Sequence, residues 1–159
     1  MSEPDTGARA SRQRSGRVLV ALQFALLLAL GALAVRAMLT KPVPPGVWAL
    51  WLACAVVGTW ALRANRPGNF NIQPLPREGG VLVRQGPYRW IRHPMYTSVL
   101  LFAAACAWSD GSLLSWSGAC ALLGVLLVKA KVEERWMSEQ HPDYAAYSRG
   151  TTRFIPWVW

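Results

Sequence analysis

The chain has 159 residues, of which 53% are hydrophobic and 16% are charged, and its formal net charge is +9. A soluble domain averages roughly 25% charged residues, so this chain is poor in charge. Its charges are also segregated, because long runs carry almost none and the segments between them carry nearly all. The composition excludes an ordinary soluble core and indicates one domain of membrane spans joined by polar loops.

Most of the basic residues flank the apolar runs, a placement that indicates contact with anionic lipid and not with nucleic acid. The three cysteines, Cys54, Cys106 and Cys120, all lie inside apolar runs and form no Cys-x-x-Cys pair. No His, Cys or carboxylate cluster has metal-ligand spacing. We therefore expect small buried thiols, no disulfide framework and no metal site.

The N-terminal region combines a polar arm with the first apolar run. Residues 1–16 are polar and rich in arginine, so we expect a disordered basic arm ahead of a single domain over residues 17–159. The first membrane span is expected at about residues 18–38, and Gln23 is the only polar side chain in its apolar stretch. A signal peptide is the alternative interpretation, but the further apolar runs disfavour it.

A proline-rich turn at residues 41–46 leads to a second span, expected at about residues 47–62, with tryptophan at both ends as in an aromatic belt. Residues 63–94 hold five prolines, four glycines and six arginines. Such a backbone cannot face lipid, so we expect an ordered loop outside the bilayer, of the kind that often carries function.

A third span is expected at about residues 94–108, with Pro94 in its first turn and His93 or Arg92 near its N-cap. This run is short for a full span, so the helix should be tilted or begin upstream.

A tight turn at residues 109–112 leads to a fourth span at about residues 112–129, so the last two spans should form an antiparallel hairpin. Because no breaker precedes Pro142, the fourth helix should continue out of the membrane and carry Lys129, Glu133 and Glu134 with it.

The distribution of basic residues predicts the orientation. The N-terminal arm, the long loop and the tail from residue 129 hold four, six and five Lys or Arg residues, whereas the opposite side holds two. Because Lys and Arg are kept on the cytoplasmic side, we expect a multi-pass protein of the plasma or inner membrane with both termini in the cytoplasm.

Two polar segments carry residues suited to chemistry. Residues 86–96 are dense in hydrogen-bonding side chains and end at a helix start, where free N–H groups could bind a carboxylate or phosphate. Glu133 and Glu134 lie near the end of the fourth helix, where acidic side chains oppose the helix dipole and predict a cationic or hydroxyl-rich partner. The structural alternatives are a loop on lipid headgroups and a solvated helix end.

The stretch Gly86-Pro87-Tyr88-Arg89-Trp90-Ile91-Arg92-His93-Pro94-Met95-Tyr96 resembles the Arg-His-Pro-x-Tyr signature of the isoprenylcysteine carboxyl methyltransferases and the related phospholipid methyltransferases. The segments Glu133-Glu134, Pro142-x-Tyr144-x-x-Tyr147 and Arg153-Phe154-Ile155-Pro156 are similar to the C-terminal signature of the same family. Phe70-Asn71-Ile72-x-Pro74-x-Pro76 is similar to the lead-in of bacterial members.

The resemblance implies an all-α membrane bundle of about four transmembrane helices, with a cytoplasmic loop and a C-terminal segment that bind S-adenosylmethionine. It implies methyl transfer to a lipophilic or lipidated acceptor, most like carboxyl O-methylation of the isoprenylcysteine type. Phospholipid (ethanolamine) N-methylation and a non-catalytic membrane scaffold are the alternatives. The oligomeric state stays open.

The residues that the resemblance assigns to the site come from both segments. The expected cofactor contacts are Tyr88, His93, Pro94, Tyr96, Glu133 and Glu134. The expected catalytic set is Arg92, Glu134 and Arg153, with the two arginines as candidates for the anionic group of the substrate or for locking a lid. Ser98 stands where many relatives have glycine, which could narrow the cofactor or substrate channel.

Overall fold

The computed structural model describes residues 6–65, 81–156 and 158. Its helices in chain order are α1 (Thr6–Thr40), α2 (Pro45–Ala64), the 3-10 turn η1 (Gly86–Arg89), α3 (Pro94–Asp110), α4 (Leu113–Gln140) and α5 (Tyr144–Arg149). Within these described ranges the extended pairing consists of isolated bridges, so the expected all-α bundle is confirmed. The lead-in motif at residues 70–76 lies outside the described residues.

Three helices are long and apolar enough to cross a membrane, namely residues Gln13–Thr40 of α1, α2 and α4. The remaining long helix, α3, has 17 residues. At 1.5 Å per residue it spans about 25 Å, slightly less than a hydrocarbon core of about 30 Å. It begins at Pro94 and does not extend upstream. The prediction of about four membrane helices therefore holds approximately, with three spans and one shorter helix.

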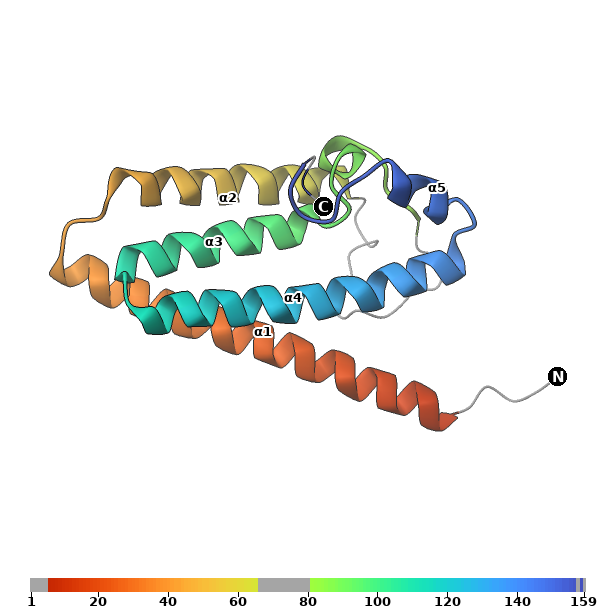
Figure 1. Cartoon of the computed structure of the whole chain (residues 1–159), viewed down its shortest axis with the longest axis horizontal. Helices are drawn as coiled ribbons and strands as arrows, with labels where there is room; N and C mark the ends of the chain where they lie inside the picture. Colours follow the sequence, from red (N-terminus) through yellow and green to blue (C-terminus); the bar gives the residue numbers. More distant parts are fainter. Residues whose placement is uncertain (1–5, 66–80, 157, 159) are drawn as a thin grey trace.

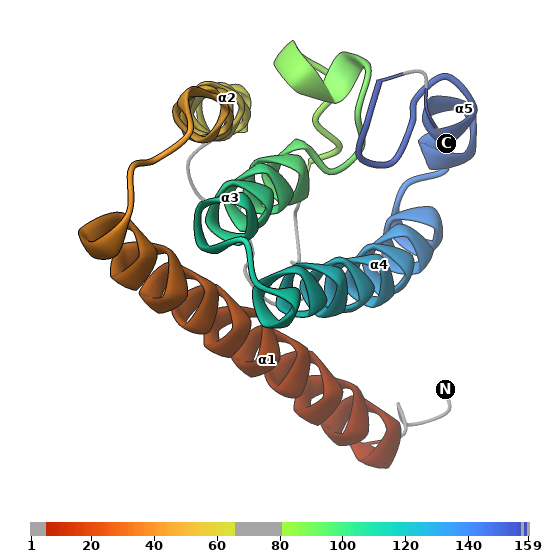
Figure 2. The same ribbon diagram turned by 60° about the vertical axis from the view of Figure 1, so that its left-hand side comes forward.

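The short helix α3 lies at the centre of the bundle, where it packs against α1, α2 and α4. Figure 2 shows α3 between α2 and α4, with α1 crossing the outer side of α4. The core is formed by eight buried residues from α1, α3, α4 and the tail, namely Leu30, Ala34, Ala103, Cys106, Leu122, Leu126, Ala130 and Phe154. Large apolar side chains such as Leu28 and Leu39 are exposed on the outside, as lipid-facing positions should be.

The start of α1 differs from the expected disordered arm. The helix begins at Thr6, so residues 6–16 continue the first membrane helix, and residues 1–5 lie outside the described residues. The physical reason is that extending an existing helix requires far less free energy than nucleating one. The segment also contains alanine, arginine and glutamine, which are good helix formers, and no proline.

The α3–α4 hairpin forms as predicted. His93 is the N-cap of α3 and Pro94 occupies its first turn. At the other end Gly111 adopts a left-handed conformation with φ of 73°, which terminates α3. Ser112 then caps α4 by accepting a hydrogen bond from the Ser115 amide, and α4 runs without interruption to Gln140.

The polar parts of the chain gather at one end of the bundle. In Figure 1 the α1–α2 and α3–α4 connections lie at the left, whereas η1, α5 and the C-terminal half of α4 lie toward the right. The end that holds η1 and α5 is therefore where a site could form from residues far apart in the sequence.

Candidate functional site

The C-terminal tail is joined to the loop before α3 by backbone hydrogen bonds. The Arg92 amide donates to the Thr152 carbonyl at 2.8 Å, and the His93 amide donates to the Arg153 carbonyl at 3.1 Å. The Thr152 amide returns a bond to the Trp90 carbonyl at 3.0 Å. This short parallel pairing brings the two sequence motifs together.

The turn η1 is fixed against α2 and α5. Gly86 has φ of 58°, and a Cβ atom there would lie 2.7 Å from Cβ of Ala64 and 3.2 Å from Nε1 of Trp60. Only glycine fits both the conformation and the close approach. From the other side, the Tyr147 hydroxyl donates to the Tyr88 carbonyl at 2.7 Å. The position of Tyr88 in η1 therefore depends on contacts with two other helices, α2 and α5.

Glu134 is the centre of the polar network. Its Oε1 accepts hydrogen bonds from Nε of Arg92 at 3.0 Å and from Nε of Arg153 at 3.0 Å. Its Oε2 accepts from the terminal nitrogen of Arg153 at 2.7 Å. The side chains of Glu134 and Arg153 are 16% exposed and that of Arg92 is 12% exposed, so these are largely desolvated ion pairs. The contact with Glu134 raises the pKa of Arg153.

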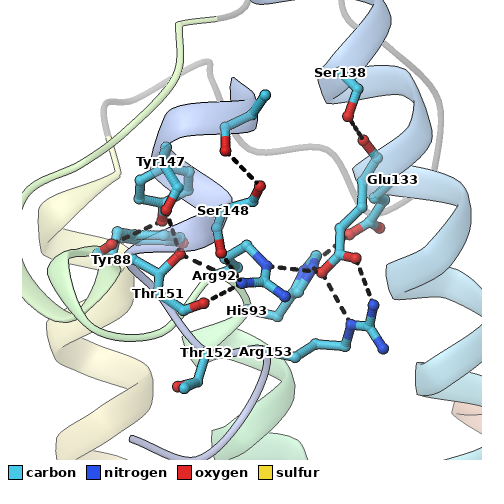
Figure 3. A network of polar contacts seen from close by, with 12 residues as sticks. Tyr88, Arg92, His93, Glu133, Ser138, Tyr147, Ser148, Thr151, Thr152 and Arg153 are labelled. Carbon is cyan, nitrogen blue, oxygen red and sulfur yellow. Dashed lines mark hydrogen bonds and ion pairs between the residues drawn. The ribbon is translucent and has the colours of Figure 1, made fainter. Parts of the chain in front are cut away.

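Arg92 also binds the end of α5. Its guanidinium donates to the Ser148 carbonyl at 2.9 Å and to the Thr151 carbonyl. Figure 3 shows Arg92 beside Ser148 and Thr151. Arg92 therefore ties the loop before α3 to α4 and to α5 at the same time.

His93 lies between the two glutamates. Its Nε2 is 3.1 Å from Oε1 of Glu134, and its Nδ1 is 3.4 Å from Oε2 of Glu133. Burial lowers the pKa of His93, but the hydrogen bonds to Glu133 and Glu134 outweigh this effect and the pKa is raised. Both ring nitrogens can donate only in the charged imidazolium, so this geometry favours a protonated His93.

Glu133 faces a more open side of the network than Glu134 does. Its side chain is 23% exposed, and its Oε1 accepts a hydrogen bond from the Tyr96 hydroxyl. The rings of Tyr96 and His93 are stacked, with centroids 5.3 Å apart and planes 5° from parallel. Burial, with a contribution from the charge of Glu133, raises the pKa of Tyr88 to about 12, so that phenol is neutral at physiological pH. A partly accessible carboxylate thus lies beside flat aromatic surfaces.

The predicted site residues therefore meet in one region, although the sequence did not indicate their partners. Arg92, His93, Glu134 and Arg153 form a connected ionic group, and Tyr96 and Glu133 extend it. The remaining two, Tyr88 and Pro94, flank the group, with Tyr88 in η1 and Pro94 buried at the start of α3.

Ser98 lies on α3, one turn after the start of that helix. It is 6% exposed and its hydroxyl donates to the Met95 carbonyl at 2.8 Å. Its Oγ lies 3.3 Å from where a Cβ on Gly58 would be, so Ser98 packs at the contact between α3 and α2.

Sequence reasoning missed a buried polar pair beside the site. Lys129 was expected to continue with the fourth helix out of the membrane, and in the structure its side chain is 1% exposed. Its Nζ donates to Oε1 of Gln23 at 2.6 Å and lies 5.1 Å from the centre of the Tyr96 ring. The signal was present in the sequence, because Gln23 is the lone polar side chain of its apolar run.

The three long apolar helices fit an integral membrane protein, and the polar network lies at one end of the helical bundle. A model of the phospholipid methyltransferase family matches residues 46–143, and the chain belongs to that family. The matched range holds Arg92, His93, Tyr96, Glu133 and Glu134, whereas Arg153 lies beyond it. The resemblance stated from the motifs is confirmed, and membership supports membrane methyltransferase activity.

One curated relative is the Cobalt-zinc-cadmium resistance protein CzcN of Cupriavidus metallidurans. It is 33% identical over 82 residues, which make up 50% of this chain and 38% of that protein. The match thus covers less than half of the length of this relative. Among the residues that the structure describes, no group of three or more His, Cys, Asp or Glu side chains could hold a metal ion.

Proposed function

We propose that the protein transfers a methyl group from S-adenosylmethionine to a lipophilic acceptor at the membrane interface. The observation that carries the proposal is the convergence of the two family motifs on one buried network at the polar end of the bundle. Membership of the phospholipid methyltransferase family supports methyl transfer as the reaction at this network. We further propose that residues 17–159 act as a single domain, that both termini and the site lie on the cytoplasmic side, and that the membrane is the plasma or inner membrane.

The chemistry of the donor set fits this cofactor. S-adenosylmethionine presents ribose hydroxyls, an ammonium group and a sulfonium, all of which a carboxylate can bind, and an adenine ring that stacks on aromatic surfaces. Glu133 offers a carboxylate that is 23% exposed, next to the stacked rings of His93 and Tyr96. The site thus combines negative charge and aromatic faces where a cationic, partly aromatic ligand requires them.

The two glutamates receive different roles in this proposal. Glu133, Tyr88, His93 and Tyr96 contact the cofactor, and Pro94 fixes the start of α3 that presents two of them. Glu134 is already bound by Arg92, Arg153 and His93, so its main role is to hold the tail against the loop. Arg92 and Arg153 act by closing the site, because both guanidinium groups are occupied by Glu134.

Bound S-adenosylmethionine supplies an activated methyl group on a positively charged sulfur. The protein then has to hold the acceptor in line with the methyl group and exclude water. The largely buried ionic network excludes water, and the apolar helices beside it offer a surface on which a lipophilic acceptor can be held. A carboxylate acceptor requires no general base, whereas an amine must lose its proton before it attacks.

Carboxyl O-methylation of a lipophilic acid is our first candidate reaction. Phospholipid N-methylation is the second candidate, because the family that matches this chain is named for the methylation of phospholipids. Lipid extracts from cells with and without the protein distinguish the two, since one accumulates methyl esters and the other accumulates methylated ethanolamine headgroups.

Titration of S-adenosylhomocysteine into the detergent-purified protein tests the proposal. We expect a micromolar dissociation constant, which corresponds to roughly −8 kcal/mol. Glu133→Gln should weaken binding at least tenfold, whereas Glu139→Gln should not, because Glu139 pairs with Arg135 on an exposed part of α4. The absence of binding to a folded wild-type protein would contradict the proposal and favour a membrane scaffold without methyltransferase activity.

A further inference from the structure

A small pocket lies between the end of η1 and the end of α5. Its volume is about 170 Å³, and its walls are formed by Trp90, Arg149, Gly150, Thr151 and Thr152. Among the described residues other than its chain neighbours, a Cβ atom on Gly150 would lie within 4 Å of the Tyr147 carbonyl oxygen alone, at 3.8 Å. The space above this glycine is therefore open to a ligand.

The pocket lies on the other side of the tail from the ionic network. Thr152 lines the pocket, and its hydroxyl donates to the Trp90 carbonyl at 3.1 Å. The next residue, Arg153, reaches the Glu134 carboxylate instead. Successive side chains of an extended segment point to opposite sides, and Figure 3 shows Thr152 and Arg153 extending in different directions. The pocket is thus separate from the proposed cofactor contacts.

The pocket carries positive charge that the described acidic side chains do not balance. Arg149 forms one wall, and the guanidinium carbon of Arg89 lies 5.9 Å from the centre of the Trp90 ring. Within residues 81–156 the carboxylates of the polar end are already paired, namely Glu133 with His93, Glu134 with Arg92 and Arg153, Glu139 with Arg135, and Asp143 with Arg84. Arg89 and Arg149 take part in no ion pair with a described residue, so both can bind an anion.

The aromatic side chains place the pocket at the level of the lipid headgroups. The Trp90 side chain is 42% exposed, and its ring centre lies 5.8 Å from that of Trp60, which is 44% exposed. Trp60 belongs to the last turns of α2, a helix long and apolar enough to cross a membrane. Tryptophan concentrates where the hydrocarbon core meets the headgroups. A pocket beside this pair therefore lies at the depth of the lipid phosphates.

We propose that this pocket binds the phosphate group of an anionic phospholipid. The Arg149 guanidinium binds phosphate oxygens, for which its planar fork of N–H donors is suited, and Arg89 adds a second positive charge. Trp90 and Trp60 contact the glycerol backbone and the first carbons of the acyl chains. The five lining residues include no carboxylate, so a headgroup that carries an ammonium group finds no counter-ion there. The site is independent of the proposed methyl transfer.

Lipid bound in this pocket would also fasten the tail. Gly150 and Thr151 connect α5 to the backbone pairing between Thr152 and the loop before α3. Arg92 already joins this loop to the Thr151 carbonyl on the other side. A phosphate between Arg149 and Trp90 would join the same two segments a second time, so an anionic lipid should stabilise the folded protein.

Native mass spectrometry of the detergent-purified protein tests the inference. Titration with dioleoylphosphatidylglycerol or dioleoylphosphatidylcholine compares an anionic and a zwitterionic lipid with the same chains. We expect one site that prefers phosphatidylglycerol by about fivefold or more, the effect of roughly one basic residue near an anionic lipid. Arg149→Gln should remove most of this preference, and Arg89→Gln/Arg149→Gln should remove it entirely. Lys131→Gln is the matched control, because it removes the same charge from an exposed position on α4.

Thermal unfolding gives a second measurement. Phosphatidylglycerol should raise the unfolding temperature of the wild type above its value in phosphatidylcholine, and it should not do so for Arg149→Gln. In phosphatidylcholine the two proteins should unfold at the same temperature, because the Arg149 side chain is exposed. An unchanged preference in Arg149→Gln, or an equal loss in Lys131→Gln, would overturn the inference. Displacement of the lipid by glycerol phosphate at equal concentration would also overturn it, since the ligand would then be a soluble phosphate.

S-adenosylhomocysteine titration keeps this inference apart from the proposed function. Arg149→Gln should bind S-adenosylhomocysteine as the wild type does, because Arg149 is not among the proposed cofactor contacts. Failure of every protein to bind it would contradict the proposed function alone, because the lipid preference is measured without cofactor.

Discussion

Glu133 and Glu134 are neighbours on α4, and apart from the His93 ring that both contact, their carboxylates face different partners. Successive residues of a helix are rotated by about 100°, so adjacent side chains cannot point the same way. Glu134 faces the tail and binds Arg92 and Arg153, whereas Glu133 faces Tyr96 and is the more exposed of the two. The two adjacent glutamates thus differ: the Glu134 carboxylate is held by two arginines, and the Glu133 carboxylate is the more accessible one.

Glu134→Gln should therefore loosen the tail. The change removes the negative charge between two largely buried guanidinium groups, and breaking such a pair from one side is more costly than the pair itself is stabilising. Because the groups keep some solvent contact, we expect a loss of about 2 kcal/mol. The unfolding temperature in detergent should fall by about 4–8 °C for a chain of this size.

Glu139→Gln is the matched control for that measurement. Its ion pair with Arg135 joins side chains that are 53% and 78% exposed, and such pairs contribute little. Its unfolding temperature should stay within about 1–2 °C of the wild type. Equal effects of the two substitutions would mean that Glu134 does not fasten the tail.

At this scale the sequence identified the members of the network but not its bonds. The family resemblance of the two motifs assigned Arg92, His93 and Glu134 to the site. Their partners could not be derived, because the tail reaches α4 through backbone pairing with the loop. The contact between Lys129 and Gln23 could not be derived for a related reason, since Gln23 lies on a helix far away in the sequence.

Helices were more predictable than the contacts between them. The second, third and fourth spans were expected at about residues 47–62, 94–108 and 112–129. The first residue of each expected span lies within two residues of the observed start of α2, α3 and α4. Proline and glycine set these boundaries locally, and the continuation of α4 followed from the absence of a breaker. The start of α1 and the pairing of the tail depend on helix propagation and on tertiary contacts, which local signals do not contain.

The turn η1 supplies a prediction about how the loop is held. Gly86→Ala would force an L side chain into φ of 58° and place its Cβ 2.7 Å from Ala64. The left-handed conformation alone costs about 1–2 kcal/mol, and relief of the contact would move η1 away from α2. We expect a fall of several degrees in the unfolding temperature and weaker S-adenosylhomocysteine binding.

Gly124→Ala is the comparison, because a Cβ at Gly124 on α4 would meet nothing within 4 Å. Alanine in a helix interior is favoured over glycine by up to about 1 kcal/mol, so this variant should be as stable as the wild type or more stable. A stable, tightly binding Gly86→Ala protein would show that the loop does not need this close contact.

The bundle has one end that holds the polar network and one end made of short turns. Which end faces the cytoplasm can be tested with introduced cysteines. In a variant with its native cysteines replaced by alanine, Pro42→Cys marks the α1–α2 turn and Ser138→Cys marks the end of α4, both exposed positions. If the site faces the cytoplasm, a membrane-impermeant maleimide should label the first in intact cells and the second only after the membrane is opened. The reverse pattern would invert the proposed orientation.

The order in which the helices pack has a consequence for biogenesis. Helix α2 packs mainly on α3, and α1 packs on α3 and α4, so the two helices made first find their main partners in the helices made later. They must therefore enter the bilayer on their own apolarity, and both are long and apolar enough to do so. The shorter α3 has polar residues buried at its end and is joined to α4 by a tight capped turn. Insertion of α3 together with α4 as one hairpin would complete the bundle and bring Lys129 to Gln23 in the same event.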